Sequence, residues 1–205
     1  MLDPVLRRWI DPPLDRAGAW LARRNVPANG LTLVGLGIGL LSVPLLACGL
    51  YGAALVAILT NRLLDGLDGA VARHGAPTAF GGYLDIVCDM FFYAAVPVGF
   101  ALADPGNAIW AALLLASFVC TCASFLGRAV MAAKRGEPDD GQRGVKSFFH
   151  AAGLVEGSET AIAFVLFCLF PGSFPWLAGG LAALCIWTAA GRLATTWKSE
   201  SESGL

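Results

Sequence analysis

Two stretches of this sequence carry paired aspartates inside otherwise apolar segments. They read NRLLDGLDGAVAR (61–73) and GGYLDIVCD (81–89). The first pair is spaced three residues apart and the second four apart, so each pair lies on one face of a helix. The four acids are Asp65, Asp68, Asp85 and Asp89. Gly75 and Pro77 lie between the stretches and permit a tight turn, so we expect the two acidic faces to point at each other.

The composition places these acids in a membrane. Of the 205 residues, 57% are hydrophobic and only 14% are charged, which is typical of a protein embedded in a bilayer. The net charge of -1 gives no electrostatic footprint for nucleic acid. The six cysteines lack the spacing of a zinc site or a disulfide framework, so we interpret them as small core residues.

Six apolar segments have about the 20 residues that a membrane helix needs. They run over residues 31–50, 53–72, 82–102, 108–133, 149–170 and 174–197. Cationic residues gather before the first, after the second, after the fourth and after the sixth segment, whereas the opposite loops contain none. The positive-inside rule therefore predicts an all-α six-transmembrane-helix bundle with both termini and the aspartates at the cytoplasmic side. We expect the membrane to be a bacterial-type inner membrane.

The chain before the first span mixes tryptophans and leucines with arginines. We expect residues 1–28 to form an interfacial amphipathic segment on the cytoplasmic leaflet, interrupted at Pro12 and Pro13. A soluble cap is the alternative for this segment. Residues 29–198 would form the six-span membrane domain that contains the aspartates, and residues 199–205 a polar tail.

The aspartates predict a metal centre. An Asp at the centre of a membrane helix costs about 2.5–3.5 kcal/mol, and four clustered carboxylates repel one another unless cations neutralise them. Ligation by oxygen alone favours Mg²⁺ or Mn²⁺, with Ca²⁺ as an alternative, and two ions would balance four charges. A purely structural ion-pair network is disfavoured because only Arg62 and Arg73 lie close in sequence. Gly66, Gly69 and Ala72 leave the helix surface beside the acids bare for a ligand, and Arg73 adds a cation suited to a phosphate. The stretch therefore suits phosphoryl transfer on a nucleotide.

The pattern resembles the signature of the CDP-alcohol phosphatidyltransferases, D-x2-D-G-x2-A-R followed by G-x3-D-x3-D. Every specified position matches: Asp65, Asp68, Gly69, Ala72, Arg73, Gly81, Asp85 and Asp89. The family also has six spans after an interfacial helix. A weaker similarity lies at residues 29–32, where relatives usually have P-N-x-x-T and this chain has Asn29 and Thr32.

The resemblance implies specific roles. Asp65, Asp68 and Asp85 would hold metals over the pyrophosphate of a CDP donor such as CDP-diacylglycerol or a related CDP-lipid. Asp89 would also hold metal and act as general base on the acceptor hydroxyl, with release of CMP. The CDP pocket would be formed by Asp65, Gly69, Ala72, Arg73 and Gly81.

The small alcohol acceptor is indicated only by scattered polar residues. Arg128 and the cations after it suit the phosphate of glycerol phosphate or an inositol phosphate, although positive-inside residues would show the same pattern. His150, Glu156 and Glu159 lie in the fifth segment, and its two acids could instead recognise serine, choline or ethanolamine, or pair with Arg128. We favour a phosphorylated or polyol acceptor.

Two other classes of membrane protein use intramembrane acids. Intramembrane prenyltransferases would leave Gly69, Ala72, Arg73 and Gly81 without a role, and a cation transporter would need acids toward the opposite membrane face, where this sequence has no second set. Finally, Gly35 and Gly39 form a small-x3-small surface, which serves either a homodimer or the internal bundle.

Overall fold

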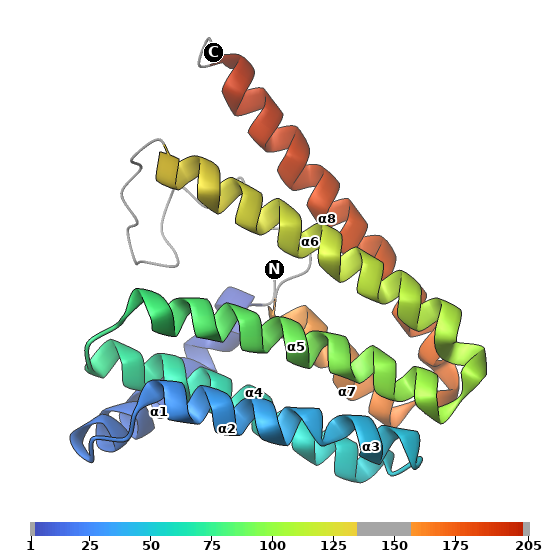
Figure 1. The fold of residues 1–205 in the computed structure, drawn as a ribbon, viewed down its shortest axis with the longest axis horizontal. Helices are drawn as coiled ribbons and strands as arrows, with labels where there is room; N and C mark the ends of the chain where they lie inside the picture. The colour runs from blue at the N-terminus through green and yellow to red at the C-terminus, as the bar shows by residue number, and fades with distance from the viewer. Residues whose placement is uncertain (1–2, 135–156, 203–205) are drawn as a thin grey trace.

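The computed structural model describes residues 3–134 and 157–202, and its regular structure there is entirely helical (Figure 1). The elements follow in the order α1 (Asp3–Arg23), α2 (Ala28–Leu40), α3 (Ser42–Ala47), α4 (Tyr51–His74), α5 (Ala79–Ala103), η1 (Pro105–Asn107), α6 (Ala108–Lys134), α7 (Gly157–Leu169), η3 (Pro171–Ser173) and α8 (Phe174–Glu202). The predicted all-α fold class is confirmed.

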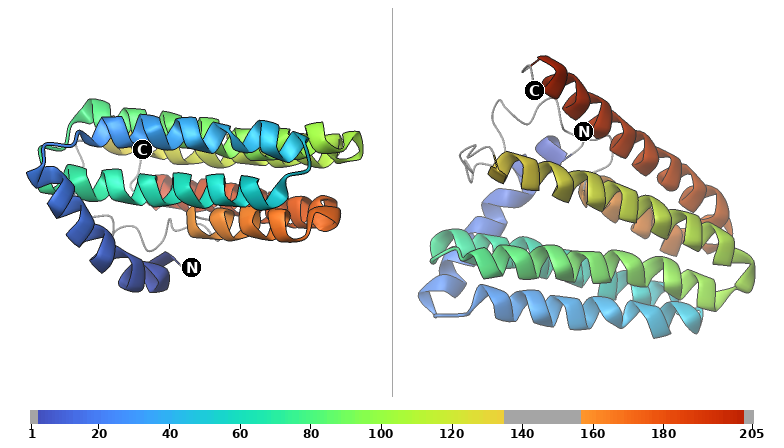
Figure 2. Two further views of the ribbon diagram at one scale, coloured as in Figure 1. Left: turned by 90° about the horizontal axis from the view of Figure 1, so that it is seen from below. Right: turned by 45° about the horizontal axis from the view of Figure 1, so that its top comes forward.

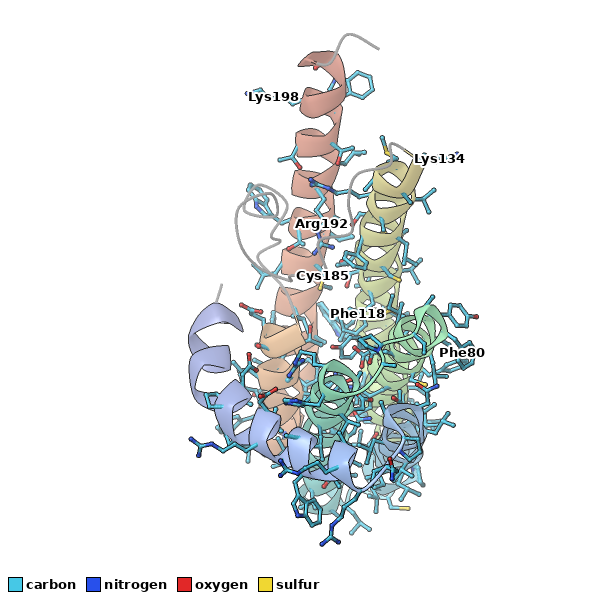
Figure 3. The ribbon with its side chains drawn as sticks, turned by 90° about the vertical axis from the view of Figure 1, so that its left-hand side faces the viewer. Phe80, Phe118, Lys134, Cys185, Arg192 and Lys198 are labelled. Carbon is cyan, nitrogen blue, oxygen red and sulfur yellow. The ribbon has the colours of Figure 1, made fainter. Side chains whose placement is uncertain are left out.

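The helices form an elongated bundle. Helices α2, α4, α5 and α7 run roughly along one direction, and α1 crosses obliquely at one end, where it packs mainly on α4 (Figure 2). Helices α6 and α8 pack against each other and lean away from the other helices toward the end that carries Lys134 and Lys198 (Figure 3). The end of α4 that carries the first aspartate pair is therefore close to α1, α2 and α5.

Within the described residues, four helical segments are long and apolar enough to cross a membrane: Ala28–Ala47, Ala79–Ala103, Pro105–Lys134 and Pro171–Lys198. Helix α4 has sufficient length, but its second half carries the charged residues of the 61–73 stretch. Helix α7 is apolar and has 13 residues in the described part of the chain. The count of six spans thus stays a prediction for α4 and for the segment that ends in α7.

The first segment is divided into two helices at Leu41. Pro44 lies in the first turn of α3 and has no backbone N–H, so it cannot continue the hydrogen-bond ladder of α2. The chain direction is nevertheless kept, and α2 and α3 together form one apolar segment of 20 residues.

Helix α1 runs continuously through Pro12 and Pro13, so the predicted interruption is wrong. The reason lies in the contacts that follow the prolines. Gly18 crosses Ala70 so closely that a Cβ atom on Gly18 would come within 2.6 Å of the Ala70 Cβ. Packing of this half of α1 on α4 supports the helix where the two prolines remove backbone hydrogen bonds.

The turn between the two acidic stretches is as tight as predicted. Helix α4 ends at His74, and α5 begins at Ala79. Thr78 caps α5 because its hydroxyl accepts a hydrogen bond from the Gly81 backbone N–H at 3.0 Å. This short connection makes α4 and α5 antiparallel neighbours, so that both acidic faces lie at the same end of the bundle.

Aromatic rings fill the centre of the bundle. Phe100 stacks on Phe174 with ring centroids 4.5 Å apart, and Phe167 packs edge-on against both. Phe92 and Phe164 extend this cluster toward the aspartates. All five side chains are fully buried, so the scaffold of the site is rigid.

The glycine pair of α2 faces the inside of the same chain. A Cβ atom on Gly35 would lie 3.2 Å from the Leu64 Cβ, and one on Gly39 would lie 2.7 Å from the Phe92 ring and 2.8 Å from the Asn61 amide nitrogen. The close approach of α2 to α4 and α5 therefore requires these glycines, as the internal-bundle interpretation expected.

Candidate metal and substrate site

Three of the four aspartates converge. Asp65 and Asp68 on α4 and Asp85 on α5 each place a carboxylate oxygen within 4.8 Å of the others. Asp68 is buried, and Asp65 and Asp85 are half-buried. The predicted meeting of the two acidic faces is therefore found for these three residues. Their oxygens form the kind of hard donor set that suits Mg²⁺ or Mn²⁺.

A threonine from α2 completes this cluster. The Thr32 hydroxyl lies 2.6 Å from Asp68 Oδ2 and donates a hydrogen bond to it, and Thr32 is itself buried. Nearby, a Cβ atom on Gly81 would lie 3.1 Å from Asn29 Oδ1, so the start of α2 approaches the start of α5 closely. Asn29 and Thr32 were the weak similarity in the sequence. The structure brings both to the site.

Asp89 has a different environment from the other three aspartates. Its Oδ1 accepts a hydrogen bond from Arg62 Nη2 at 2.7 Å, and the pair also forms a salt bridge. Asp89 lies outside the three-acid cluster, whereas the Arg62 Nη1 atom reaches Asp65 Oδ2 at 3.6 Å. The sequence disfavoured a structural ion-pair network at the aspartates. Part of such a network exists nevertheless, because Arg62 pairs with Asp89 and Asp65.

Arg62 belongs to a wider network that sequence reasoning missed. Its Nε and Nη2 donate to Asn61 Oδ1 at 2.9 and 2.7 Å, and its Nη1 donates to the Tyr93 hydroxyl at 3.2 Å. Asn61 in turn donates to the Gly35 carbonyl at 2.9 Å. The signal in the sequence was a polar Asn-Arg pair within an apolar helix, since buried polar groups require partners.

A small pocket joins these features. It is lined by residues of α2, α4 and α5, namely Thr32, Gly35, Leu36, Asn61, Arg62, Asp65, Asp68, Cys88 and Asp89. Asp65 and Asp68 of the metal-type cluster thus share this pocket with Arg62 and Asp89.

The residues assigned to a CDP pocket lie beside the acids on α4 and at the start of α5. Gly69 is covered by Arg73, whose Nη1 would be 3.6 Å from a Cβ atom placed there. The same Arg73 has its Nη2 3.8 Å from Asp15 Oδ1 on α1, while half of its side chain is exposed. Ala72 and Gly81 are half-buried.

Gly66 does not leave a bare surface, contrary to the prediction. A Cβ atom on Gly66 would lie 2.8 Å from Leu14 Cδ1, because α1 packs into this notch of α4. The glycine therefore serves helix packing. Sequence patterns could not show this, since the approach of α1 depends on the tertiary fold.

The residues assigned to the acceptor are only partly described. His150 and Glu156 lie outside the described residues. Glu159 is half-buried in the first turn of α7, and Arg128 is half-buried on α6. A second arginine, Arg192 on α8, donates to the Thr121 carbonyl of α6 at 3.3 Å and lies between the two helices (Figure 3).

Together, the fold and the site define a helical membrane protein with a carboxylate centre suited to divalent cations. Comparison with known proteins identifies the family: residues 25–191 match the family model of the CDP-alcohol phosphatidyltransferases, and the chain belongs to this family. The match covers both acidic stretches and extends into α8. The family consists of transferase enzymes of phospholipid synthesis, and the chain is a multi-pass membrane protein.

Three curated proteins illustrate the similarity. Inner membrane protein YnjF of Escherichia coli (strain K12) is 49% identical over 194 residues, which is 94% of each chain. Archaetidylinositol phosphate synthase of Methanothermobacter thermautotrophicus is 39% identical over 99 residues, or 47% of this chain and 46% of that protein. The protein of the same name from Pyrococcus horikoshii is 35% identical over 98 residues, or 47% of this chain and 52% of that one.

Proposed function

We propose that this protein transfers a phosphatidyl group from a CDP-lipid, CDP-diacylglycerol or a related donor, to a phosphorylated polyol, with release of CMP. The observation that carries the proposal is the convergence of Asp65, Asp68 and Asp85 within 4.8 Å in a chain of this family. Membership of a transferase family favours this function over a cation transporter or an intramembrane prenyltransferase.

Asp65, Asp68 and Asp85 would hold two divalent cations, Mg²⁺ or Mn²⁺. The donor chemistry fits such ions, because the cluster contains only carboxylate oxygens and the neighbouring Thr32 hydroxyl. When bound, the ions supply charge neutralisation for the diphosphate and its leaving group. Asp65, Gly69, Ala72, Arg73 and Gly81 would line the CDP pocket.

The protein groups would perform the remaining tasks. Asp89 would accept the proton of the acceptor hydroxyl while the hydroxyl oxygen attacks the phosphorus atom that bears the lipid. Arg73 would leave Asp15 to contact a donor phosphate, because its 3.8 Å contact with Asp15 is partly exposed and weak. Alignment of the two reactants at a rigid site contributes the rest of the rate enhancement.

An inositol phosphate is the first acceptor to test. Two relatives have names that give archaetidylinositol phosphate as their product, and they match about half of this chain. Arg128 and Arg192 supply cations on α6 and α8 for the acceptor phosphate, and guanidinium groups suit phosphate oxygens. His150, Glu156 and Glu159 would contact the polyol.

The proposed topology has six spans, with α4 and the segment ending in α7 as the two additional membrane helices. Residues 1–28 would lie on the cytoplasmic leaflet, residues 29–198 would form the catalytic domain and residues 199–205 a polar tail. Both termini and the aspartates would then face the cytoplasm, where soluble acceptors are found. Cysteine labelling of the α4–α5 turn from either side of inverted membrane vesicles tests this orientation.

The activity itself is tested by CMP release. Purified protein in liposomes receives CDP-diacylglycerol, Mn²⁺ or Mg²⁺, and one of five acceptors: inositol phosphate, glycerol 3-phosphate, serine, ethanolamine or choline. We expect release that requires the metal and a phosphorylated acceptor and that is strongly reduced in Asp89→Asn. Release with the amino alcohols alone would refute the acceptor, and no release with any acceptor would refute the reaction.

A further inference from the structure

Asp89 is hydrogen-bonded to a guanidinium group, whereas the other three aspartates converge on one another. Its Oδ1 is bound by Arg62 Nη2 at 2.7 Å, while Asp65, Asp68 and Asp85 form a separate cluster. We propose that Arg62 is the positioning residue of Asp89: it holds Oδ1, so that Oδ2 is presented to the hydroxyl of the acceptor. This inference rests on the proposed function.

Arg62 is held too firmly to act as a mobile counter-ion. Its side chain is only 15% exposed, and three of its nitrogens donate hydrogen bonds to Asn61, Tyr93 and Asp89. The guanidinium carbon also lies 4.4 Å from the Phe92 ring centroid and 5.1 Å from that of Tyr93. Moving Arg62 would break all of these contacts at once, and an unpaired buried charge is costly.

The network ties the position of Asp89 to three helices. Asp89, Phe92 and Tyr93 share one face of α5, because they are spaced by three and four residues. Arg62 and Asn61 belong to α4, and the Asn61 amide is anchored on the Gly35 carbonyl of α2 at 2.9 Å. Asp89 is thus oriented by the rigid part of the bundle, which suits a group that must meet a reacting atom.

The contacts of Arg62 with the carboxylates are unequal. Its Nη2 lies 2.7 Å from Asp89 Oδ1, whereas its Nη1 lies 3.6 Å from Asp65 Oδ2. Arg62 therefore holds Asp89 more closely than it holds Asp65.

The transfer step then balances without a further reactant. The acceptor oxygen forms a new bond to phosphorus, the bond from phosphorus to the CMP oxygen breaks, and that oxygen keeps the electron pair. The hydroxyl proton moves to Asp89 Oδ2. Arg62 touches none of the reacting atoms and acts only through Asp89.

The test uses the full-length protein in liposomes and four variants: Arg62→Gln, Arg62→Lys, Asp89→Asn and the double variant Arg62→Gln/Asp89→Asn. We measure kcat and the KM for CDP-diacylglycerol, and separately Mn²⁺ binding by electron paramagnetic resonance. We expect Arg62→Gln to lower kcat about 100-fold through misplacement of the base. KM should stay at its wild-type value, and Mn²⁺ affinity should not fall, because the variant only removes a positive charge 3.6 Å from Asp65 Oδ2. Arg62→Lys should have a kcat between those of wild type and Arg62→Gln, because lysine keeps the positive charge but lacks the planar set of N–H donors of a guanidinium group.

The double variant shows whether the effect of Arg62 on kcat depends on Asp89. If Arg62 works through Asp89, the double variant is no slower than Asp89→Asn alone. Losses that multiply would overturn the proposal, and so would a wild-type kcat in Arg62→Gln or weakened Mn²⁺ binding with an unchanged kcat.

Tyr93→Phe keeps the test valid if Arg62→Gln does not fold. This substitution removes only the hydroxyl that Arg62 Nη1 contacts at 3.2 Å and retains the ring in its packing. A smaller fall in kcat, again with normal KM and Mn²⁺ affinity, supports the positioning role, and an unchanged kcat overturns it. Wild-type protein that releases no CMP would instead refute the proposed function, so the two failures are distinguishable.

Discussion

The glycines of α2 allow a sharp test of how the site is built. Gly37 and Gly39 lie in the same turn of this helix, but a Cβ atom on Gly37 would meet no atom within 4 Å, whereas one on Gly39 would meet Phe92 at 2.7 Å and Asn61 at 2.8 Å. Alanine at both positions gains the same helix propensity, about 0.5–1 kcal/mol in water, so this contribution cancels in the comparison.

The remaining difference is the cost of overpacking. Phe92 is fully buried, and the Asn61 side chain is held by the Gly35 carbonyl on one side and Arg62 on the other. Neither neighbour can yield without breaking contacts, and an extra methyl in a packed core costs about 1–3 kcal/mol. We therefore expect Gly39→Ala to be less stable than Gly37→Ala by about 1–3 kcal/mol.

The assay is reversible unfolding in mixed detergent micelles, followed by circular dichroism, together with CMP release. Gly39→Ala should also lose activity, since a displaced Asn61 moves Arg62. Gly37→Ala serves as the matched control and should retain both properties. Equal stabilities would refute the close packing of α2 on α4 and α5. A dimer lost in Gly37→Ala would instead assign this glycine surface to a subunit interface.

Three further outcomes are expected. Thr32→Val, which removes the donor to Asp68 but keeps the shape, should lower the free energy of unfolding by about 1.5–3 kcal/mol in detergent; an unchanged value would contradict the buried hydrogen bond. Asp85→Asn should weaken Mn²⁺ binding at least about 10-fold in equilibrium dialysis. Loss of a residue that only hydrogen-bonds to a metal ligand already costs about 10-fold in affinity, and loss of the ligand itself should cost more. Wild-type affinity would show that Asp85 is not a metal ligand. Gly18→Val should detach α1 from Ala70 and accelerate trypsin cleavage within α1, and an unchanged cleavage rate would contradict the close crossing.

The sequence was sufficient for features that depend on local spacing. The helical class, the short turn between His74 and Ala79 and the convergence of Asp65, Asp68 and Asp85 all follow from apolar length, glycine and proline positions and helical periodicity. These signals act within one helix or across one turn, so few arrangements satisfy them.

Features that depend on the approach of distant helices were not predictable in the same way. Gly66 looked like an open surface beside the acids, yet Leu14 of α1 fills it. Pro12 and Pro13 indicated an interruption, yet α1 continues because it rests on α4. In both cases tertiary packing outweighs the local preference, and nothing in the spacing of α1 fixes the helix on which it packs.

The most informative difference concerns the fourth aspartate. The i, i+4 spacing that pairs Asp85 with Asp89 also separates them by slightly more than one turn, about 6 Å along the helix axis. Asp85 therefore meets the α4 acids, while Asp89 lies one turn deeper and meets Arg62, which precedes Asp65 by three residues. Because α4 and α5 are antiparallel, a residue later in α5 faces a residue earlier in α4. Arg62, three residues before Asp65, therefore lies at the level of Asp89. The same register argument predicts that a chain with an apolar residue in place of Arg62 must orient its fourth aspartate by another group.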